Sequence, residues 1–169
     1  RLREEHDFRG YIHLKTIPDA APELLARPGR HADRLSINVE LPTASGLAQF
    51  APEKDGQRIR QAMQGVDRQV QAWRAATREQ RQAQSLPGAP AQRAAVPRFA
   101  PGGQSTQMIV GADRATDADI LESSHTLYAG YGLRRVYYSA FSPIPDASRD
   151  LPPQAPPLMR EHRLYQADW

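Results

Sequence analysis

The sequence predicts an α/β fold with about four parallel strands and intervening helices, an open half of a TIM-type (β/α) barrel. First, segments with a period of two alternate along the chain with segments of helical period. Second, the 169 residues suffice for one core but fall short of the roughly 250 residues of a complete eight-stranded barrel. Third, one strand carries polar side chains on the face that a barrel turns toward its lumen.

The first strand and helix are predicted from the N-terminal third. Residues 8–17 have the composition of a strand that Pro18 stops. A short helix is expected over residues 21–31, with Asp19 as its N-cap and Gly29 near its end.

The second strand, within residues 34–43, is the most informative segment. Its apolar and polar residues alternate in the order Leu35, Ser36, Ile37, Asn38, Val39, Glu40 and Leu41. In a parallel barrel the apolar set would face the helices and the polar set the lumen. Buried Asn and Glu are costly unless they are hydrogen-bonded, so Asn38 and Glu40 are the best candidate ligand-binding pair. The alternative is a polar ladder satisfied within the protein, or a face open to water.

A long helix is predicted in the middle of the chain. Residues 43–55 have the small residues of a loop, and residues 56–84 follow with an apolar residue at each helical repeat. The stripe consists of Ile59, Met63, Val66, Val70 and Trp73. Residues 86–103 are rich in Pro, Gly and Ala and predict an irregular loop.

The last third predicts two further strands around a helix. Residues 105–111 form strand three, with Gln107, Ile109 and Gly111 on one face. A helix starting at Thr116 has a capping-box pattern and ends at Gly132.

Strand four is expected over residues 135–141, which include Ser139. Residues 146–157 form a Pro-rich connector and residues 159–169 begin another helix. The predicted organisation is a barrel part over residues 1–145 and a connector with a helical extension over residues 146–169.

Composition excludes several classes of protein. The chain has no cysteine and hence no disulfide or thiolate metal site, and its net charge of +3 is modest. No run of 18 apolar residues and no signal-like start is present, which favours a cytoplasmic protein without a membrane span. The histidines lack metal-ligand spacing, and no P-loop, Gly-x-Gly-x-x-Gly or Gly-x-Ser-x-Gly motif occurs. The first residue is not Met, so a longer parent chain is expected.

Other candidate contacts lie on the first and third strands. Lys15 and His13 share a face and could meet an anion, although an edge strand would leave them in water. Gly111 follows strand three and precedes a helix, where main-chain N–H groups can approach a ligand. A lone glycine there is also compatible with a simple turn.

Four segments together resemble one family. They are residues 10–18, 33–43, 99–112 and 135–143. They are similar to the C-terminal half of the barrel in radical S-adenosylmethionine (SAM) proteins described as DNA modification or repair enzymes. Residues 161–169 resemble the stretch that precedes a helix-hairpin-helix region in that group. The group is associated with a uracil-DNA glycosylase-like partner, and nucleic acid is a further candidate partner.

The resemblance implies a SAM pocket. Asn38 and Glu40 match the ribose contact of radical SAM proteins. The strand three segment, including Gln107, Ile109 and Gly111, resembles the element whose backbone packs on the adenine. It departs from that element because Gln107 replaces a glycine and the closing Glu is absent. Strand four, with Ser139, would complete the wall, and Lys15 joins the set of cofactor contacts.

The resemblance also implies what the chain lacks. The three-cysteine motif that holds the [4Fe–4S] cluster, and the strand that holds the SAM amino group, belong to the missing N-terminal half of the barrel. The full-length parent is therefore expected to be a radical SAM enzyme that cleaves SAM reductively to a 5′-deoxyadenosyl radical. This fragment alone is expected to be inactive, and its catalytic residues are not identified.

Two alternatives remain open. The chain could be a non-catalytic nucleic-acid-binding module that uses the Arg-rich helix over residues 58–81, although four acidic residues interrupt its charge. Those residues are Glu53, Asp55, Asp67 and Glu79. It could also be a structural α/β module whose polar strand faces meet other parts of a longer chain.

Overall fold

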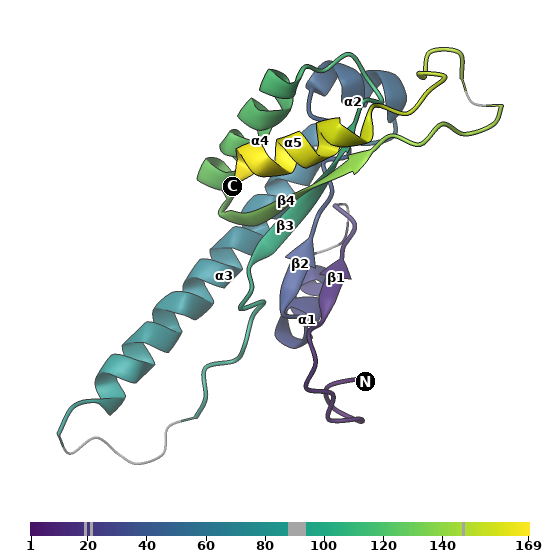
Figure 1. Ribbon diagram of the computed structural model, residues 1–169. Coiled ribbons are helices and arrows are strands. Elements are labelled where there is room, and N and C mark those ends of the chain that lie inside the picture. Colours follow the sequence, from purple (N-terminus) through teal and green to yellow (C-terminus); the bar gives the residue numbers. More distant parts are fainter. Residues whose placement is uncertain (19, 21, 88–93, 147) are drawn as a thin grey trace.

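A parallel sheet of four strands organises the protein (Figure 1). The structure is a computed structural model that describes residues 1–18, 20, 22–87, 94–146 and 148–169. The strands are β1 (His13–Lys15), β2 (Arg34–Ser36), β3 (Gln104–Val110) and β4 (Leu133–Ala140). They lie in chain order, and each neighbouring pair is parallel. This confirms the predicted α/β arrangement with a parallel sheet.

Helices connect the strands and follow the last one. They are α1 (Pro22–His31), α2 (Ala44–Phe50), α3 (Gly56–Gln84), α4 (Asp117–Tyr131) and α5 (Leu158–Asp168). In the described part of the chain, no helix combines the length and apolar character that crossing a membrane requires.

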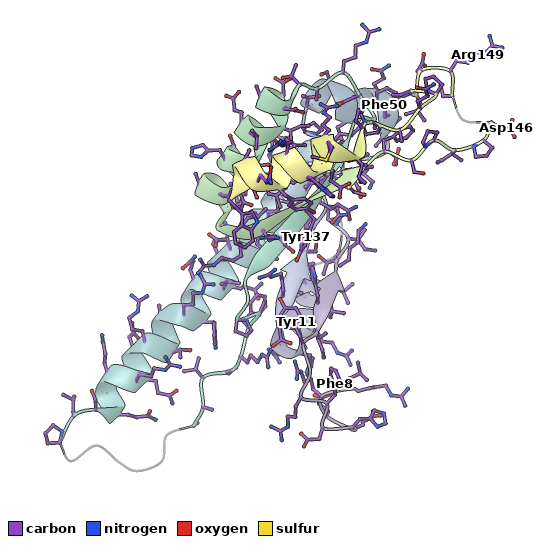
Figure 2. The ribbon with its side chains drawn as sticks, in the orientation of Figure 1. Phe8, Tyr11, Phe50, Tyr137, Asp146 and Arg149 are labelled. Carbon is purple, nitrogen blue, oxygen red and sulfur yellow. The ribbon has the colours of Figure 1, made fainter. Side chains whose placement is uncertain are left out.

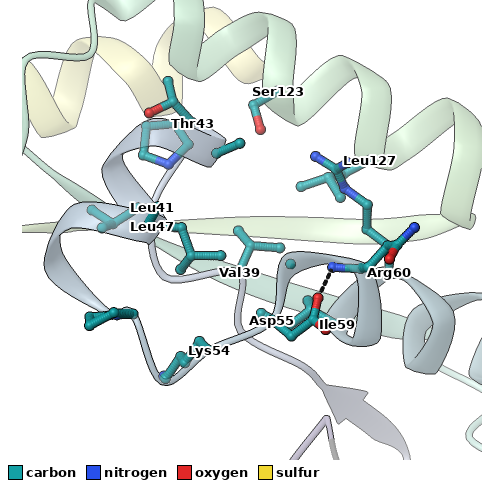
Figure 3. A pocket seen from close by; sticks show the side chains of 16 residues that line it. Val39, Leu41, Thr43, Leu47, Lys54, Asp55, Ile59, Arg60, Ser123 and Leu127 are labelled. Carbon is teal, nitrogen blue, oxygen red and sulfur yellow. Dashed lines mark hydrogen bonds between the residues drawn. The ribbon is translucent and has the colours of Figure 1, made fainter.

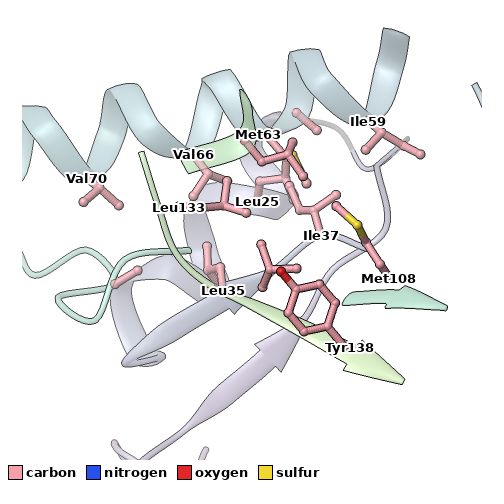
Figure 4. Packing of buried hydrophobic residues seen from close by; sticks show 14 of the residues in the cluster. Leu25, Leu35, Ile37, Ile59, Met63, Val66, Val70, Met108, Leu133 and Tyr138 are labelled. Carbon is pink, nitrogen blue, oxygen red and sulfur yellow. The ribbon is translucent and has the colours of Figure 1, made fainter. Parts of the chain in front are cut away.

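The main core lies between one face of the sheet and the helices. Figure 4 shows Leu35 of β2, Ile37 directly after β2 and Met108 of β3 packed with Ile59 and Met63 of α3. Each of these side chains is at most 2% exposed. Full burial of such a side chain contributes about 1.5–3 kcal/mol, so this layer fixes which face of the sheet is left for a site.

Two predicted helices form as expected because their signals are local. Helix α3 covers the predicted residues, and the Asp55 carboxylate accepts a hydrogen bond from the Gln57 N–H at 2.7 Å. At the start of α4, Thr116 and Asp119 form the expected capping box. Gly132 ends α4 with φ of 59°, in the left-handed region that glycine adopts without strain.

The second strand is shorter than predicted. Regular pairing ends at Ser36, and a single isolated bridge joins Glu40 to Met108. Glu40 has φ of 66°, which breaks the alternation of the two faces. Leu41 therefore leaves the main core and packs with Ala112 and Phe141 in a second cluster. The prediction that all four apolar residues of this segment share one face was wrong for Leu41.

Other boundaries also differ from the prediction. Residues 43–55 contain α2, which Thr43 caps by accepting a hydrogen bond from the Gly46 N–H at 3.0 Å. Gly29 lies inside α1 instead of ending it. The ring of Phe99 fills the space that a Cβ would occupy there, which accounts for the glycine. The first strand is limited to the three residues His13–Lys15 and pairs with β2 alone. The predicted cap Asp19 lies outside the described residues.

The C-terminal segment returns to the sheet. After the connector, α5 packs against β4 and α4, as Figure 1 shows in yellow and green. Leu164 of α5 is 2% exposed and belongs to the main core. This helix therefore covers the β4 edge of the sheet and does not reach the β1 edge.

Candidate functional site

The face of the sheet opposite the main core is polar. Its side chains belong to His13, Lys15, Arg34, Ser36, Asn38, Ser105, Gln107, Arg135, Tyr137 and Ser139. Residues in register on parallel strands share a face, so these side chains gather from all four strands. Figure 2 shows Tyr137 on this side of the ribbon, in front of the sheet. We refer to this surface as the open face.

Asn38 lies in a short hydrogen-bonded row on the open face. Its Oδ1 accepts from the Ser36 hydroxyl at 3.2 Å, and its Nδ2 donates to Gln107 Oε1 at 3.3 Å. Asn38 is only 5% exposed. Two of the predicted site residues, Asn38 and Gln107, are thus brought together, in the polar ladder that was considered as an alternative to ligand binding.

Glu40 stands where β2 has ended, beside the strand that follows it in the sheet. Its N–H donates to the Gln107 carbonyl at 3.2 Å, and its carbonyl accepts from the Ile109 N–H at 2.7 Å. These two bonds hold the left-handed backbone of Glu40 in place. A non-glycine residue in this conformation is strained, and such strain concentrates at functional sites.

Both lysines of the chain converge on the Glu40 carboxylate. Lys54, in the segment before α3, places its Nζ 2.8 Å from Glu40 Oε1. Lys15 of β1 places its Nζ 3.7 Å from the same oxygen. No partner is found in the described residues for the second oxygen, Oε2, which can therefore accept a further hydrogen bond.

A cavity of about 480 Å³ opens beside this cluster. Its lining consists of Lys15, Thr16, Ile17, Pro18, Asn38, Glu40, Glu53, Lys54, Asp55 and Ile59. The volume lies within the range of about 300–1,000 Å³ that small-molecule sites have. The site also lies at the carboxyl ends of parallel strands, where α/β folds place ligands. We call it the Glu40 cavity.

The remaining predicted site residues lie elsewhere. Ile109 packs in the second cluster with Leu41 and Phe141. Gly111 has φ of 81°, and a Cβ built on it would lie 2.8 Å from Pro156 of the connector. Ser139 is in register with Ile109 and is partly buried. None of Ile109, Gly111 and Ser139 is among the residues that line the Glu40 cavity.

A larger cavity of about 620 Å³ lies on the helix side, beneath α2 and between α3 and α4 (Figure 3). Its walls combine apolar side chains such as Leu47, Ile59 and Leu127 with polar ones such as Thr43, Arg60 and Ser123. It shares Lys54, Asp55 and Ile59 with the Glu40 cavity. None of the residues predicted to bind a cofactor lines it.

Lys54 is the residue of the candidate site that the sequence prediction missed. It lies in a segment treated as a loop, 14 positions from Glu40, and nothing local to either residue indicates their contact. The one available signal was composition, because Lys15 and Lys54 are the two lysines among 22 basic residues.

The amino-terminal part of the open face is basic. Arg34 Nη1 donates to the Tyr137 hydroxyl at 3.3 Å, and His13 Nε2 lies 3.2 Å from the Ser105 hydroxyl. Burial, reinforced by the charge of Arg34, lowers the pKa of His13 below its usual 6.5. His13 is therefore mainly neutral at pH 7, and Lys15 and Arg34 supply the charge on this side.

The donor atoms present differ in their fit to the two expected cofactors. An iron–sulfur cluster does not fit, because the chain has no cysteine. In the described residues, no group of three or more His, Asp or Glu side chains could hold a metal ion either. The Glu40 cavity offers a carboxylate and an amide, which suit hydroxyl and ammonium groups of SAM, although Lys54 already occupies one oxygen.

Comparison with protein-family models, with curated proteins and with solved structures found no match to this chain.

Proposed function

We propose that this chain is the C-terminal half of a radical SAM barrel and that the Glu40 cavity supplies part of its SAM site. One observation carries the proposal. Glu40, which has a strained left-handed backbone just beyond a parallel strand, lines a cavity of about 480 Å³ together with Asn38. The sequential order of the four parallel strands is what half of a (β/α) barrel requires. The resemblance of the four sequence segments names the cofactor.

In this proposal the chain binds and orients the cofactor. Glu40 Oε2 accepts from the ribose hydroxyls or the methionine ammonium group, while Lys54 and Lys15 neutralise the carboxylate. The row from Ser36 through Asn38 to Gln107 fixes the amide beside it. In the parent enzyme, bound SAM supplies the deoxyadenosyl group for hydrogen abstraction from a substrate, with nucleic acid as the candidate.

The proposal is tested by equilibrium dialysis of labelled SAM against this chain and the Glu40→Gln variant. The wild-type chain is expected to bind SAM weakly, with a Kd of about 1 mM, because it contains only part of the pocket. Glu40→Gln is expected to weaken binding about tenfold, since a charge-assisted hydrogen bond contributes about 1.5–3 kcal/mol.

The matched control is Glu122→Gln, the same chemical change at an exposed position of α4. It is expected to bind SAM as the wild-type chain does. Equal affinity of Glu40→Gln and wild type, or no binding by the wild type at millimolar SAM, would contradict the proposal.

A second candidate function, nucleic-acid binding, is favoured by aromatic and basic side chains at the amino-terminal end of the open face. The Arg135 guanidinium lies 4.9 Å from the centre of the Trp169 ring, and Trp169 is 87% exposed. Arg34 and Tyr137 lie beside it. Aromatic rings that stack on bases and arginines that bind phosphate are the parts of a single-strand binding surface.

This candidate predicts steeply salt-dependent binding of single-stranded DNA. Arg34→Gln should reduce the slope of log affinity against log salt by about one. Arg81→Gln, on the exposed last turn of α3, should leave the slope unchanged. The opposite pattern would instead support the Arg-rich helix as the binding element, and a flat salt dependence would exclude both.

A further inference from the structure

The two edge strands of the sheet, β1 and β4, differ in whether their outward main-chain N–H groups form hydrogen bonds. On β4, three N–H groups that point away from β3 are each bonded to a side chain of α4 or α5. The pairs are Val136 with Tyr128 Oη at 3.1 Å, Tyr138 with Tyr165 Oη at 2.9 Å, and Ala140 with Glu161 Oε2 at 2.9 Å. Tyr165 also donates to the Tyr138 carbonyl at 3.0 Å. This edge therefore has no N–H groups left at these positions for a further strand.

The outer edge of β1 is open. The Ile12 carbonyl and the Thr16 N–H bond across to the β2 side at 2.8 Å each. Because main-chain bonds alternate along a parallel ladder, the N–H and C=O groups of His13 and Lys15 point the other way. Within the described ranges, no group forms a hydrogen bond to them. Such an edge is a template for another strand.

The helix-facing side of β1 is also uncovered. Leu14 is in register with Leu35, yet Leu14 is 37% exposed and Leu35 is 0% exposed. In a right-handed β–α–β crossover the helix packs over the two strands that it joins. A strand and helix added before β1 would therefore cover Leu14.

The charge of the open face discriminates between possible occupants. Lys15 lies on the same face as Arg34, since His13 and Arg34 are in register. Glu40 is shared by Lys15 and Lys54, so one carboxylate faces two ammonium groups and positive charge remains at Lys15, whose side chain is 64% exposed. Two copies that met edge to edge at β1 would bring their Lys15 side chains together, and like charges across a strand pair are destabilising. A strand with a carboxylate opposite Lys15 would complement this charge.

We infer that the outer edge of β1 pairs with a parallel strand of a β–α unit that carries an acidic side chain opposite Lys15. The pairing adds a strand to the sheet through the free main-chain groups of His13 and Lys15. This docking deepens the proposed function by naming the edge at which the rest of the barrel joins, and it rests on that function in treating the chain as part of a larger barrel.

The experiment titrates the ¹⁵N-labelled chain with two blocked pentapeptides, Val-Glu-Val-Glu-Val and Val-Lys-Val-Lys-Val. The Glu peptide should shift the amides of His13 and Lys15 and slow their hydrogen exchange, and it should bind several-fold more tightly than the Lys peptide. The Lys15→Glu variant should reverse this preference. A spin label at the amino end of the peptide should broaden Ile12 more than Ile17 if the pairing is parallel.

Shifts at residues 136–140 instead of β1, equal affinity for both peptides, or broadening centred on Ile17 would overturn the inference. Dimerisation of the peptide-free chain through β1, seen by sedimentation and by protection of Lys15, would also overturn it. SAM binding is measured separately on the same chain. Pairing at β1 without SAM binding would therefore contradict the proposed function and leave the docking edge standing.

Discussion

At the residue scale, Glu40 combines a strained backbone with the carboxylate of the candidate site. A left-handed backbone costs a non-glycine residue about 1–2 kcal/mol. Two main-chain hydrogen bonds to β3 and the contact with Lys54 hold it there. The sequence could place Asn38 and Glu40 on the polar side of a strand, but the positive φ and Lys54 depend on contacts distant in sequence.

Two substitutions separate the backbone strain from the carboxylate. Glu40→Ala and Glu40→Gly both remove the charge, but only glycine adopts φ of 66° without strain. Glu40→Gly should therefore have a free energy of unfolding about 1 kcal/mol higher than Glu40→Ala, measured by urea denaturation. If Glu40→Ala is as stable as Glu40→Gly, the left-handed conformation is not an intrinsic cost at this position.

Asp33, directly before β2, is the second residue whose contacts reach distant parts of the chain. Its Oδ2 accepts from the Ile12 N–H at 2.7 Å and pairs with Arg3, and its Oδ1 pairs with Arg98. Burial raises the pKa of this carboxyl, but the Ile12 hydrogen bond and the two arginines together lower it below its usual 3.8. The folded state therefore favours the ionised form.

Acid titration tests this arrangement. A lowered folded pKa stabilises the protein above about pH 4, and that stability is lost as the pH falls through the folded value. Asp33→Asn should lower the free energy of unfolding at pH 7 by about 1–3 kcal/mol, and the deficit should shrink below pH 4. The control, Asp7→Asn at an exposed ion pair, should change stability by less than about 1 kcal/mol. A deficit independent of pH would contradict the assigned ionisation.

At the element scale, local signals were sufficient for α3 and α4 and insufficient for β2 and α2. Helical periodicity and caps such as Thr116 lie within a few residues of the helices that they define. The end of β2 is set by the isolated bridge to Met108, 68 positions away along the chain from Glu40. The small residues Ser45 and Gly46 suggested a loop, although Thr43 caps a helix there.

Because α5 covers the edge of β4, loss of one α5 hydroxyl should weaken the hydrogen bonding of β4. Tyr165→Phe leaves the Tyr138 N–H without its partner, which should lower the free energy of unfolding by about 1–3 kcal/mol. Amide exchange at Tyr138 should accelerate while exchange in α3 follows only the global change. Tyr131→Phe is the control, because no hydrogen bond of the Tyr131 hydroxyl is found in the described residues. Unchanged exchange at Tyr138 would show that α5 does not close this edge.

At the scale of the whole molecule, one face of the sheet is closed by helices and the other is polar and open. The alternation of strands and helices, the chain length and the polar strand predicted this asymmetry. The sequence could not show that α5 closes the β4 edge, because that closure depends on the hydroxyls of Tyr128 and Tyr165 reaching main-chain groups.

The most direct test of the SAM site is amide shift mapping of the ¹⁵N-labelled chain during titration with SAM. The proposed function predicts the largest shifts at Asn38 and Glu40, with smaller shifts at Lys15 and Lys54, all around the Glu40 cavity. Glu40→Gln should abolish most of these shifts. No shifts at millimolar SAM, or shifts confined to the cavity beneath α2 (Figure 3), would contradict the assignment of the site.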